Sequence, residues 1–172
     1  MKFYRDSQNK KYRQQNAGKI ITTEDLQRKI DEDTRINNNA QSAGKGDSER
    51  WGIRALELTN KFRAENGLPA LSWNQRLHEI GIVHSKDMAE GRVPFGHQGF
   101  NERMRKVPFF VRSFSENVAW NANCGDPVEV AVQGWINSPG HRKNMLSTSN
   151  LCGIAVFVHY GRYYFTQLFA LA

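Results

Sequence analysis

Apolar residues recur at helical spacing from about Ser48 onward, and this periodicity predicts the first helix of a folded region. Asp47 or Ser48 can cap this helix, because a short polar side chain accepts a hydrogen bond from a free backbone N–H group of the first turn. Gly67 and Pro69 follow the apolar stretch and end the helix. The expected buried face consists of Trp51, Ala55, Leu58 and Phe62.

Two further long helices are predicted downstream. Asn74 caps the first of them. The second opens with Asp126 and Pro127, a capping residue followed by a proline at the first helical position, and it stops before Pro139. A short helix is expected at 101–106. The apolar face of the helix after Asn74 is expected to contain Leu77, Gly81, His84 and Met88.

The C-terminal part of the chain has a different pattern, typical of strands. Residues 153–160 and 163–172 are rich in β-branched and aromatic residues that alternate with other types, and the Gly161-Arg162 pair between them predicts a tight hairpin. Another strand fits residues 115–120. Helices followed by antiparallel strands indicate an α+β fold, with helices packed on a small, mostly antiparallel sheet.

Residues 1–47 differ from the rest of the chain and are expected to form an extended N-terminal arm. This arm is rich in Asn, Gln, Lys and Arg, so it cannot bury enough apolar surface to offset the entropy lost on ordering. One helix is predicted over 22–36, and residues 37–47 are typical of a linker before the domain at 48–172. A solvated tail and a binding arm both remain open. The basic side chains expected to contact a partner are Lys2, Arg5, Lys10, Lys11, Arg13 and Lys19.

The 172-residue chain carries a net charge of +7 and has an isoelectric point near 9.6, which favours acidic partners. No apolar run approaches the ~20 residues that a membrane span requires. The N-terminus lacks the apolar core and cleavage site of a secretory signal, so a cytosolic location is expected. Cys124 and Cys152 are too few for a disulfide framework, although a single bridge between them stays open.

Four separated stretches carry most of the chemistry in the sequence. They are 95–100 (FGHQGF), 114–120 (FSENVAW), 135–142 (WINSPGHR) and 164–170 (YFTQLFA). In this order they resemble the CAP superfamily, also called the SCP domain, which groups cysteine-rich secretory, antigen 5 and pathogenesis-related proteins. The likeness covers about 53–172 and is greatest to the branch common in bacteria and some protists. It implies an α–β–α sandwich.

Glu116 lies among apolar residues of a strand and needs a partner there, because burial of an unpaired charge is costly. Two imidazoles and one carboxylate in a cleft could hold a divalent metal, or act as a general base and its orienting group. The resemblance implies a central cavity with two histidines and two acidic residues, which binds zinc in some relatives. His97 matches the first histidine and Glu116 the first acid. Where many eukaryotic members have the second acid and second histidine, this chain has Ser138 and Tyr164.

His141 follows the bacterial-type pattern and could supply the second imidazole. With His97 and Glu116 it forms the candidate catalytic set, and with His97 the candidate zinc set. It could equally be a junction residue that bonds Glu116 or a backbone carbonyl and holds its short helix, which Ser138 caps, against the strand. Among the remaining histidines, His84 is expected in the core or at the cleft edge. His78 and His159 are expected to be surface or strand polar residues.

Three functions remain open at this level. The first is a non-catalytic binding module, docked into a larger intracellular assembly through its basic arm, with an acidic tubulin-like polymer such as a ciliary microtubule as partner. The second is a hydrolase with His97, Glu116 and His141 around a metal ion and water. The third is lipid or sterol binding, which some relatives show, with the arm on an anionic membrane. Nucleic acid is disfavoured, because the arm lacks a base-reading fold.

Overall fold

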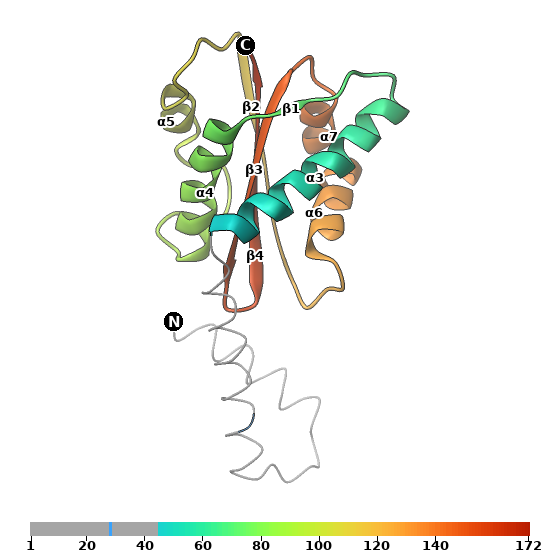
Figure 1. Cartoon of the computed structure of the whole chain (residues 1–172). Coiled ribbons are helices and arrows are strands. Elements are labelled where there is room, and N and C mark those ends of the chain that lie inside the picture. The colour runs from blue at the N-terminus through green and yellow to red at the C-terminus, as the bar shows by residue number, and fades with distance from the viewer. Residues whose placement is uncertain (1–27, 29–44) are drawn as a thin grey trace. The chain divides into compact units, whose positions relative to one another are not determined.

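The computed structural model describes residue 28 and residues 45–172, and all that follows concerns these residues (Figure 1). The helix predicted over 22–36 and the six basic side chains of the arm lie outside them. In chain order the elements are α3 (Lys45–Glu65), β1 (Ser72–Trp73), α4 (Gln75–Ala89), α5 (Phe100–Arg105), β2 (Ser113–Ala122), α6 (Pro127–Asn137), α7 (Pro139–Met145), β3 (Leu151–His159) and β4 (Arg162–Leu171).

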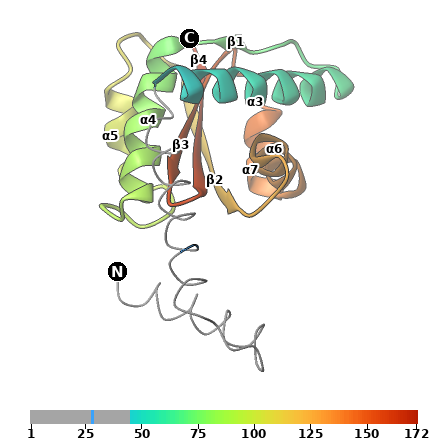
Figure 2. The same cartoon turned by 60° about the horizontal axis from the view of Figure 1, so that its bottom comes forward.

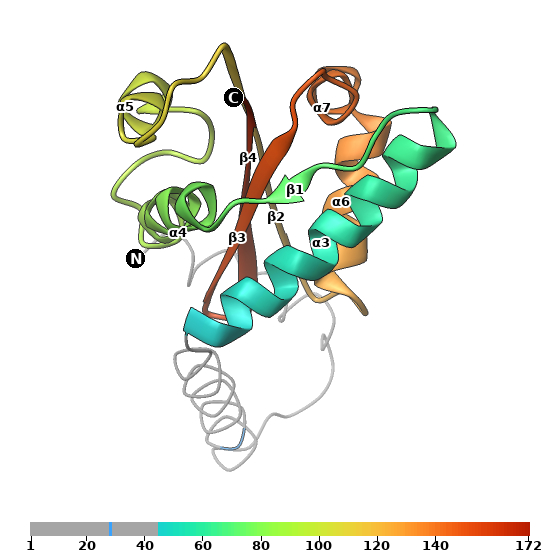
Figure 3. The same cartoon turned by 45° about the horizontal axis from the view of Figure 1, so that its top comes forward.

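The strands form one four-stranded sheet in the order β1-β3-β4-β2. The β2–β4 and β3–β4 pairs are antiparallel, and β1 alone runs parallel to its neighbour β3. Figure 3 shows β1 beside β3, where the chain passes from α3 to α4. The predicted small, mostly antiparallel sheet is therefore confirmed, with the two-residue strand β1 as an addition.

Helices cover both faces of the sheet, with α4 and α5 on one side and α6 and α7 on the other (Figure 2). The larger core joins α3, α6 and α7 to the sheet and includes fully buried Trp135, Phe165 and Phe169. A second core packs Leu77 and Ile80 of α4 against β4 on the other face. Each large side chain removed from water in this way contributes about 1.5–3 kcal/mol. The architecture is the expected α–β–α sandwich.

Two of the predicted helix caps are confirmed. Asn74 accepts a hydrogen bond from the N–H of Leu77, and Asp126 accepts from the first turn of α6. The cap predicted at Asp47 or Ser48 is wrong, because α3 already begins at Lys45. Ser138 occupies the N-cap position of α7, but its side chain makes no capping hydrogen bond.

The β3–β4 hairpin turns one residue earlier than predicted. Tyr160 and Gly161 both have positive φ, at 49° and 69°, and they form the two-residue loop between His159 and Arg162. Two consecutive residues with positive φ give the turn a twist that matches the flanking strands. Glycine at the second position satisfies this geometry without steric cost.

Side chains from the helices close both outer edges of the sheet. On the free edge of β2, Asn144 donates to the carbonyl of Glu116 at 3.1 Å and Trp135 donates to that of Val118 at 3.1 Å. Beyond β1, Ser48 of α3 covers the edge of β3, where its hydroxyl accepts from the N–H of Val156. His78 of α4 covers the same edge and donates to the carbonyl of Ile154. These bonds occupy backbone groups that would otherwise pair with a strand from another molecule.

The expectation that His78 is a surface or strand polar residue is wrong. It is completely buried, and its Nδ1 donates to the carbonyl of Ile154 across 2.7 Å. His159, by contrast, lies half-buried on β3, as a strand polar residue should. No helix in the described part of the chain is long and apolar enough to cross a membrane.

The two cysteines are free thiols with different surroundings. Cys152 is fully buried in the larger core, and burial raises the pKa of its thiol well above the ordinary range. Cys124 lies in the loop after β2, where its thiol is 3.5 Å from the side-chain oxygen of Asn121. The single bridge that the sequence left open is therefore not formed.

Candidate functional site

Glu116 is the centre of the candidate site and lies in the middle of β2. In the antiparallel register it faces Leu168 of β4, and its side chain shares the sheet face that packs on α4. The residue is only 4% exposed. A carboxylate at this depth is costly unless it is paired and hydrogen-bonded, so its neighbours decide what it can do.

Arg103 from α5 provides that pairing. Its Nε donates to Oε2 of Glu116 at 2.6 Å, and its Nη2 donates to Oε1 at 2.8 Å. This two-point geometry matches the planar guanidinium to the carboxylate and makes the ion pair directional. The same guanidinium donates to the carbonyls of Gln98 and His97, at 2.8 and 3.3 Å. Arg103 therefore holds both the acid and the loop before α5.

His97 is carried by that loop and completes the contacts of Glu116. Its Nδ1 lies 2.9 Å from Oε1 of Glu116, while about half of the imidazole side chain is exposed. The loop turns at Gly96 and Gly99, whose φ values of 146° and 78° favour glycine. The conformation that brings His97 to Glu116 thus depends on two glycines of the FGHQGF stretch.

His84 approaches the same carboxylate from α4. Its Nε2 donates to the carbonyl of Gly96 at 2.8 Å and lies 4.0 Å from Oε1 of Glu116. Burial lowers the pKa of His84 below its usual value, and the positive charge of Arg103 lowers it further. This imidazole is therefore neutral at neutral pH and secures the glycine-histidine loop to α4.

His141 lies in the first turn of α7 and meets His97 at the free edge of β2. The two ring centroids are 6.5 Å apart, and the planes are inclined by 58°. Within the described part of the chain, the His141 ring makes no hydrogen bond, whereas its backbone carbonyl accepts one from Asn117. Burial lowers the pKa of His141, and the nearby His97 lowers it further. The His141 ring is therefore uncharged at neutral pH and lies beside the ring of His97.

A chain of buried amides supports this arrangement from the opposite face of the sheet. Asn117 donates to Gln167 across 3.0 Å, and Gln167 donates to the hydroxyl of Thr59 in α3 at 3.1 Å. Asn144 in α7 donates to the side-chain oxygen of Asn117 at 2.9 Å. The E-N and T-Q motifs are thereby explained in part, because their amide residues hold α3, α7, β2 and β4 in one hydrogen-bonded network.

The structure brings together the three residues that the sequence predicted. His97 contacts Glu116 directly, and His141 contacts His97 through its ring only. Arg103 was missed, because no local pattern distinguishes it from the other basic residues of α5. His84 was expected in the core or at the cleft edge, and its contact with Gly96 agrees with that expectation.

The residues present do not fit a metal centre well. Within residues 45–172 and residue 28, no group of three or more His, Cys, Asp or Glu side chains is arranged to hold a metal ion. Both oxygens of Glu116 already accept hydrogen bonds from Arg103. Tyr164, which stands where many relatives have a histidine, instead packs with Met88 and Val118 and stacks beside Trp120.

The fold and the site define a CAP-type α–β–α domain, and comparison with known proteins supports this assignment. Residues 56–169 match the sequence pattern of the CAP family, described as the cysteine-rich secretory protein family. This match covers most of the chain, and the chain belongs to that family.

Two bacterial proteins are similar to this chain in sequence. The chain is 34% identical over 123 residues to YlbC, an uncharacterised membrane protein of Bacillus subtilis (strain 168), covering 66% of this chain and 32% of the relative. It is 32% identical over 99 residues to the uncharacterised protein YkwD of the same organism, covering 55% and 37%. The chain thus spans about a third of the length of these curated relatives.

A solved structure gives the same result for the fold. It is the crystal structure of an extracellular protein containing an SCP domain from Bacillus anthracis str. Ames, with a TM-score of 0.62 and 30% identity. The likeness covers 73% of this chain and 42% of that protein. A cysteine-rich secretory protein from Staphylococcus aureus, 22% identical over 75% of this chain and 41% of its own, has the same fold with a TM-score of 0.59.

Proposed function

We propose that this chain is a non-catalytic CAP-domain binding module. The observation that carries the proposal is the state of Glu116, whose two oxygens are both engaged by Arg103 while His97 contacts one of them. A carboxylate whose charge and lone pairs are satisfied in this way is poorly suited to act as a free base or as a metal ligand. The cluster instead holds the loop before α5 against the sheet.

The competing hydrolase needs a nucleophile or an activated water. Among the described residues, no hydrogen bond joins His97 or His141 to a Ser, Thr or Cys side chain, which is the contact that an activated nucleophile requires. His97 is oriented by a carboxylate, as a general base would be, but its acidic partner is already paired with Arg103. The balance of these contacts favours a structural cluster.

The finer part of the proposal concerns the partner. We infer from the sequence that the basic arm docks the domain into a larger intracellular assembly with an acidic surface, with a tubulin-like polymer as its most specific form. The arm precedes the region matched by the family, and it concentrates Lys and Arg. Because the relatives named above include a membrane protein and an extracellular protein, imaging of the tagged chain in its own cell is the test of location.

Metal content tests the non-catalytic assignment. Full-length protein purified without chelator should contain less than stoichiometric zinc by elemental analysis, and titration with zinc should give no saturable heat at micromolar concentration. His97→Ala should leave this result unchanged. One zinc per chain in the native protein, lost in both His97→Ala and His141→Ala, would overturn the assignment and favour the hydrolase.

Co-sedimentation tests the docking surface. Full-length protein should pellet with microtubules at low salt and be released as ionic strength rises, because exposed charges are screened. Replacement of the six basic arm residues by Gln should abolish pelleting. The matched control removes the same number of charges from exposed residues of the domain and should still pellet; its positions are Arg50, Lys61, Arg76, Arg105, Lys106 and Lys143. Equal losses in both variants, or no pelleting of the native chain, would refute the arm as the docking element.

A further inference from the structure

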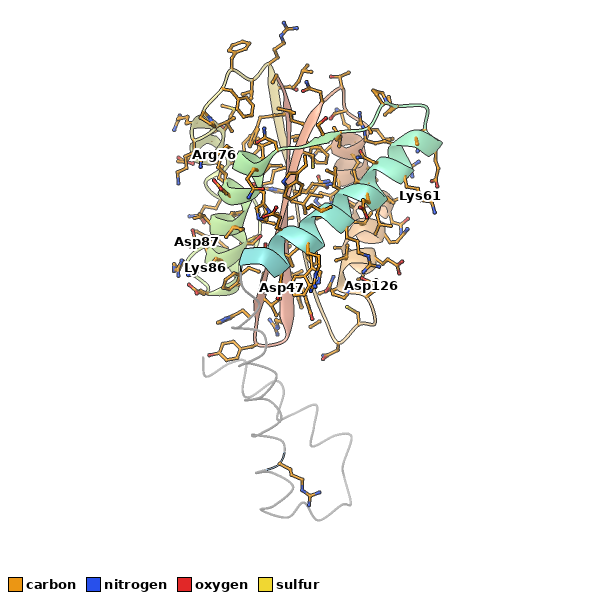
Figure 4. The ribbon with its side chains drawn as sticks, viewed as in Figure 1. Asp47, Lys61, Arg76, Lys86, Asp87 and Asp126 are labelled. Atoms are coloured by element: carbon orange, nitrogen blue, oxygen red, sulfur yellow. The ribbon has the colours of Figure 1, made fainter. Side chains whose placement is uncertain are left out.

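A pocket of about 490 Å³ is lined by residues of α4 and of the segment 93–106, among them Arg103. We call it the α4–α5 pocket. Its apolar wall is formed by Ile80, Val83 and Val93. Figure 4 labels Arg76 and Asp87, two lining residues that lie towards opposite ends of α4. A volume of this size is within the range of small-molecule sites.

His84 is a lining residue of this pocket that has an unused hydrogen-bond acceptor. The residue is only 3% exposed, and it lines the pocket from α4. Its Nε2 must carry the proton, because it faces the carbonyl of Gly96 at 2.8 Å and a carbonyl can only accept. In the neutral imidazole Nδ1 is then an acceptor, and no described residue donates a hydrogen bond to it.

Arg103, a second lining residue of the pocket, has an unused hydrogen-bond donor. Four of its five N–H groups are used, by Glu116, Gln98 and the carbonyl of His97. The one that remains is on Nη1, and Arg103 also lines the pocket. Since Glu116 compensates its positive charge, the guanidinium offers this N–H without a strong preference for an anion. The lining residues of the pocket thus include one unused acceptor, one unused donor and an apolar wall.

The charged lining argues for a neutral occupant. Three basic and three acidic side chains line the pocket, and most of them already have a partner of opposite charge, as in the Arg76–Glu79 and Asp87–Arg92 pairs. An anion would meet carboxylates, and a cation would meet guanidinium and ammonium groups, each at a cost in desolvation. The six charged lining residues are Arg76, Arg103, Lys106, Glu79, Asp87 and Glu102.

We propose that the α4–α5 pocket binds a small uncharged molecule that has an apolar body and a hydroxyl group. The apolar body packs on Ile80, Val83 and Val93, and the hydroxyl donates to Nδ1 of His84 while its oxygen accepts from Nη1 of Arg103. This inference does not depend on the proposed function, because it holds whether or not His97 and Glu116 take part in chemistry.

2-Naphthol is a suitable probe, because its two rings suit the volume and its hydroxyl can donate. In ¹H–¹⁵N correlation spectra of the full-length chain, it should cause saturable shifts confined to α4 and the segment 93–106. Naphthalene should bind at the same place at least about tenfold more weakly, because it can form neither of the two hydrogen bonds that the hydroxyl makes. 2-Naphthoate should also bind more weakly than 2-naphthol. Scattered or non-saturable shifts, or tighter binding of 2-naphthoate, would overturn the proposal.

Two matched variants locate the site. Val83→Trp fills the pocket from its rim and should abolish the shifts, whereas Val130→Trp, an equally exposed helical valine on α6 outside the pocket, should leave them unchanged. His84→Phe keeps a ring but removes the acceptor, so the preference for 2-naphthol over naphthalene should become smaller, with only the hydrogen bond from Arg103 left. Shifts that survive Val83→Trp would refute the site even if His84→Phe fails to fold.

Discussion

Arg103 and Glu116 form a buried two-point ion pair, with the guanidinium donating to both carboxylate oxygens at 2.6 and 2.8 Å. Their side chains are 8% and 1% exposed. The pair joins α5 to the middle of β2, and through the carbonyls of His97 and Gln98 it also fixes the glycine-histidine loop. The position of His97 relative to His141 therefore depends on a residue that neither motif contains.

Removal of Arg103 should be strongly destabilising. Arg103→Met leaves Glu116 buried without its counter-charge, and loss of one partner of a buried ion pair costs about 3–5 kcal/mol. Guanidinium denaturation followed by circular dichroism measures this as a lower free energy of unfolding. The control is Arg105→Met on the same helix, where the side chain is 71% exposed and the change should stay within about 0.5 kcal/mol.

The double variant Arg103→Met, Glu116→Leu separates charge from packing. Two apolar side chains can replace a buried ion pair with little loss, so the double variant should regain most of the stability lost by Arg103→Met. A double variant no more stable than Arg103→Met would mean that the hydrogen bonds to the loop, rather than the unpaired charge, dominate the loss.

Asn144→Ala tests the closure of the β2 edge. The side chain donates to the carbonyl of Glu116 and to the side-chain oxygen of Asn117, so its loss leaves two partly buried acceptors without a donor. We expect a loss of about 1–3 kcal/mol in the free energy of unfolding. Lys143→Ala, its exposed neighbour on α7, should change little. Equal effects in the two variants would show that solvent replaces Asn144 without cost.

The lowered pKa of His84 predicts a loss of stability in mild acid. Below pH 6.5, the ordinary pKa of histidine, the unfolded chain binds a proton at His84 that the folded chain does not bind. The free energy of unfolding therefore falls as the pH decreases from 6.5 towards the pKa of His84 in the folded chain. One such proton contributes at most about 1.4 kcal/mol per pH unit. Denaturant midpoints measured between about pH 7.5 and pH 5 report this slope.

A comparison of slopes assigns the effect to His84. His84→Asn cannot take up a proton in this range, so its pH slope should be shallower than that of the native chain. It should not vanish, because burial also lowers the pKa of His141 and of His159. Identical slopes in the native chain and His84→Asn would place the acid sensitivity elsewhere.

Gly153→Ala should disrupt the packing of α4 on β3. A Cβ added at this position would lie 2.2 Å from the backbone nitrogen of His78, a distance that neither backbone can accommodate without moving. We expect a loss of about 1–3 kcal/mol or more, measured by thermal or chemical denaturation. Gly134→Ala on α6 is the opposite case, because its Cβ meets nothing within 4 Å and alanine favours the helix by about 0.5–1 kcal/mol.

Local signals in the sequence predicted the elements well. The caps at Asn74 and Asp126 were recognisable because a capping side chain acts on the backbone two or three residues away. The first helix was placed too late, because Ser48 was interpreted as a cap. In the structure its hydroxyl bonds to Val156 on a strand more than a hundred residues further on, and the sequence carries no sign of that contact.

The candidate site, too, was predicted from the sequence only in part. Glu116 was recognised because a carboxylate inside an apolar strand requires a partner, and His97 and His141 were recognised from their motifs. That the partner is Arg103, and that His84 faces the α4–α5 pocket, depends on the packing of α4 and α5 on one sheet face.

The sequence by itself determined where helices and strands form, because capping and periodicity act within a few residues. It also determined which motifs these elements carry. Only the tertiary structure decided which polar groups satisfy one another. Arg63 shows the reason clearly: it is 1% exposed, and its guanidinium donates to the carbonyls of Met145 and Ser147. A buried donor is stabilised by whatever acceptor the fold brings within reach, and that choice is made by the packing of distant segments.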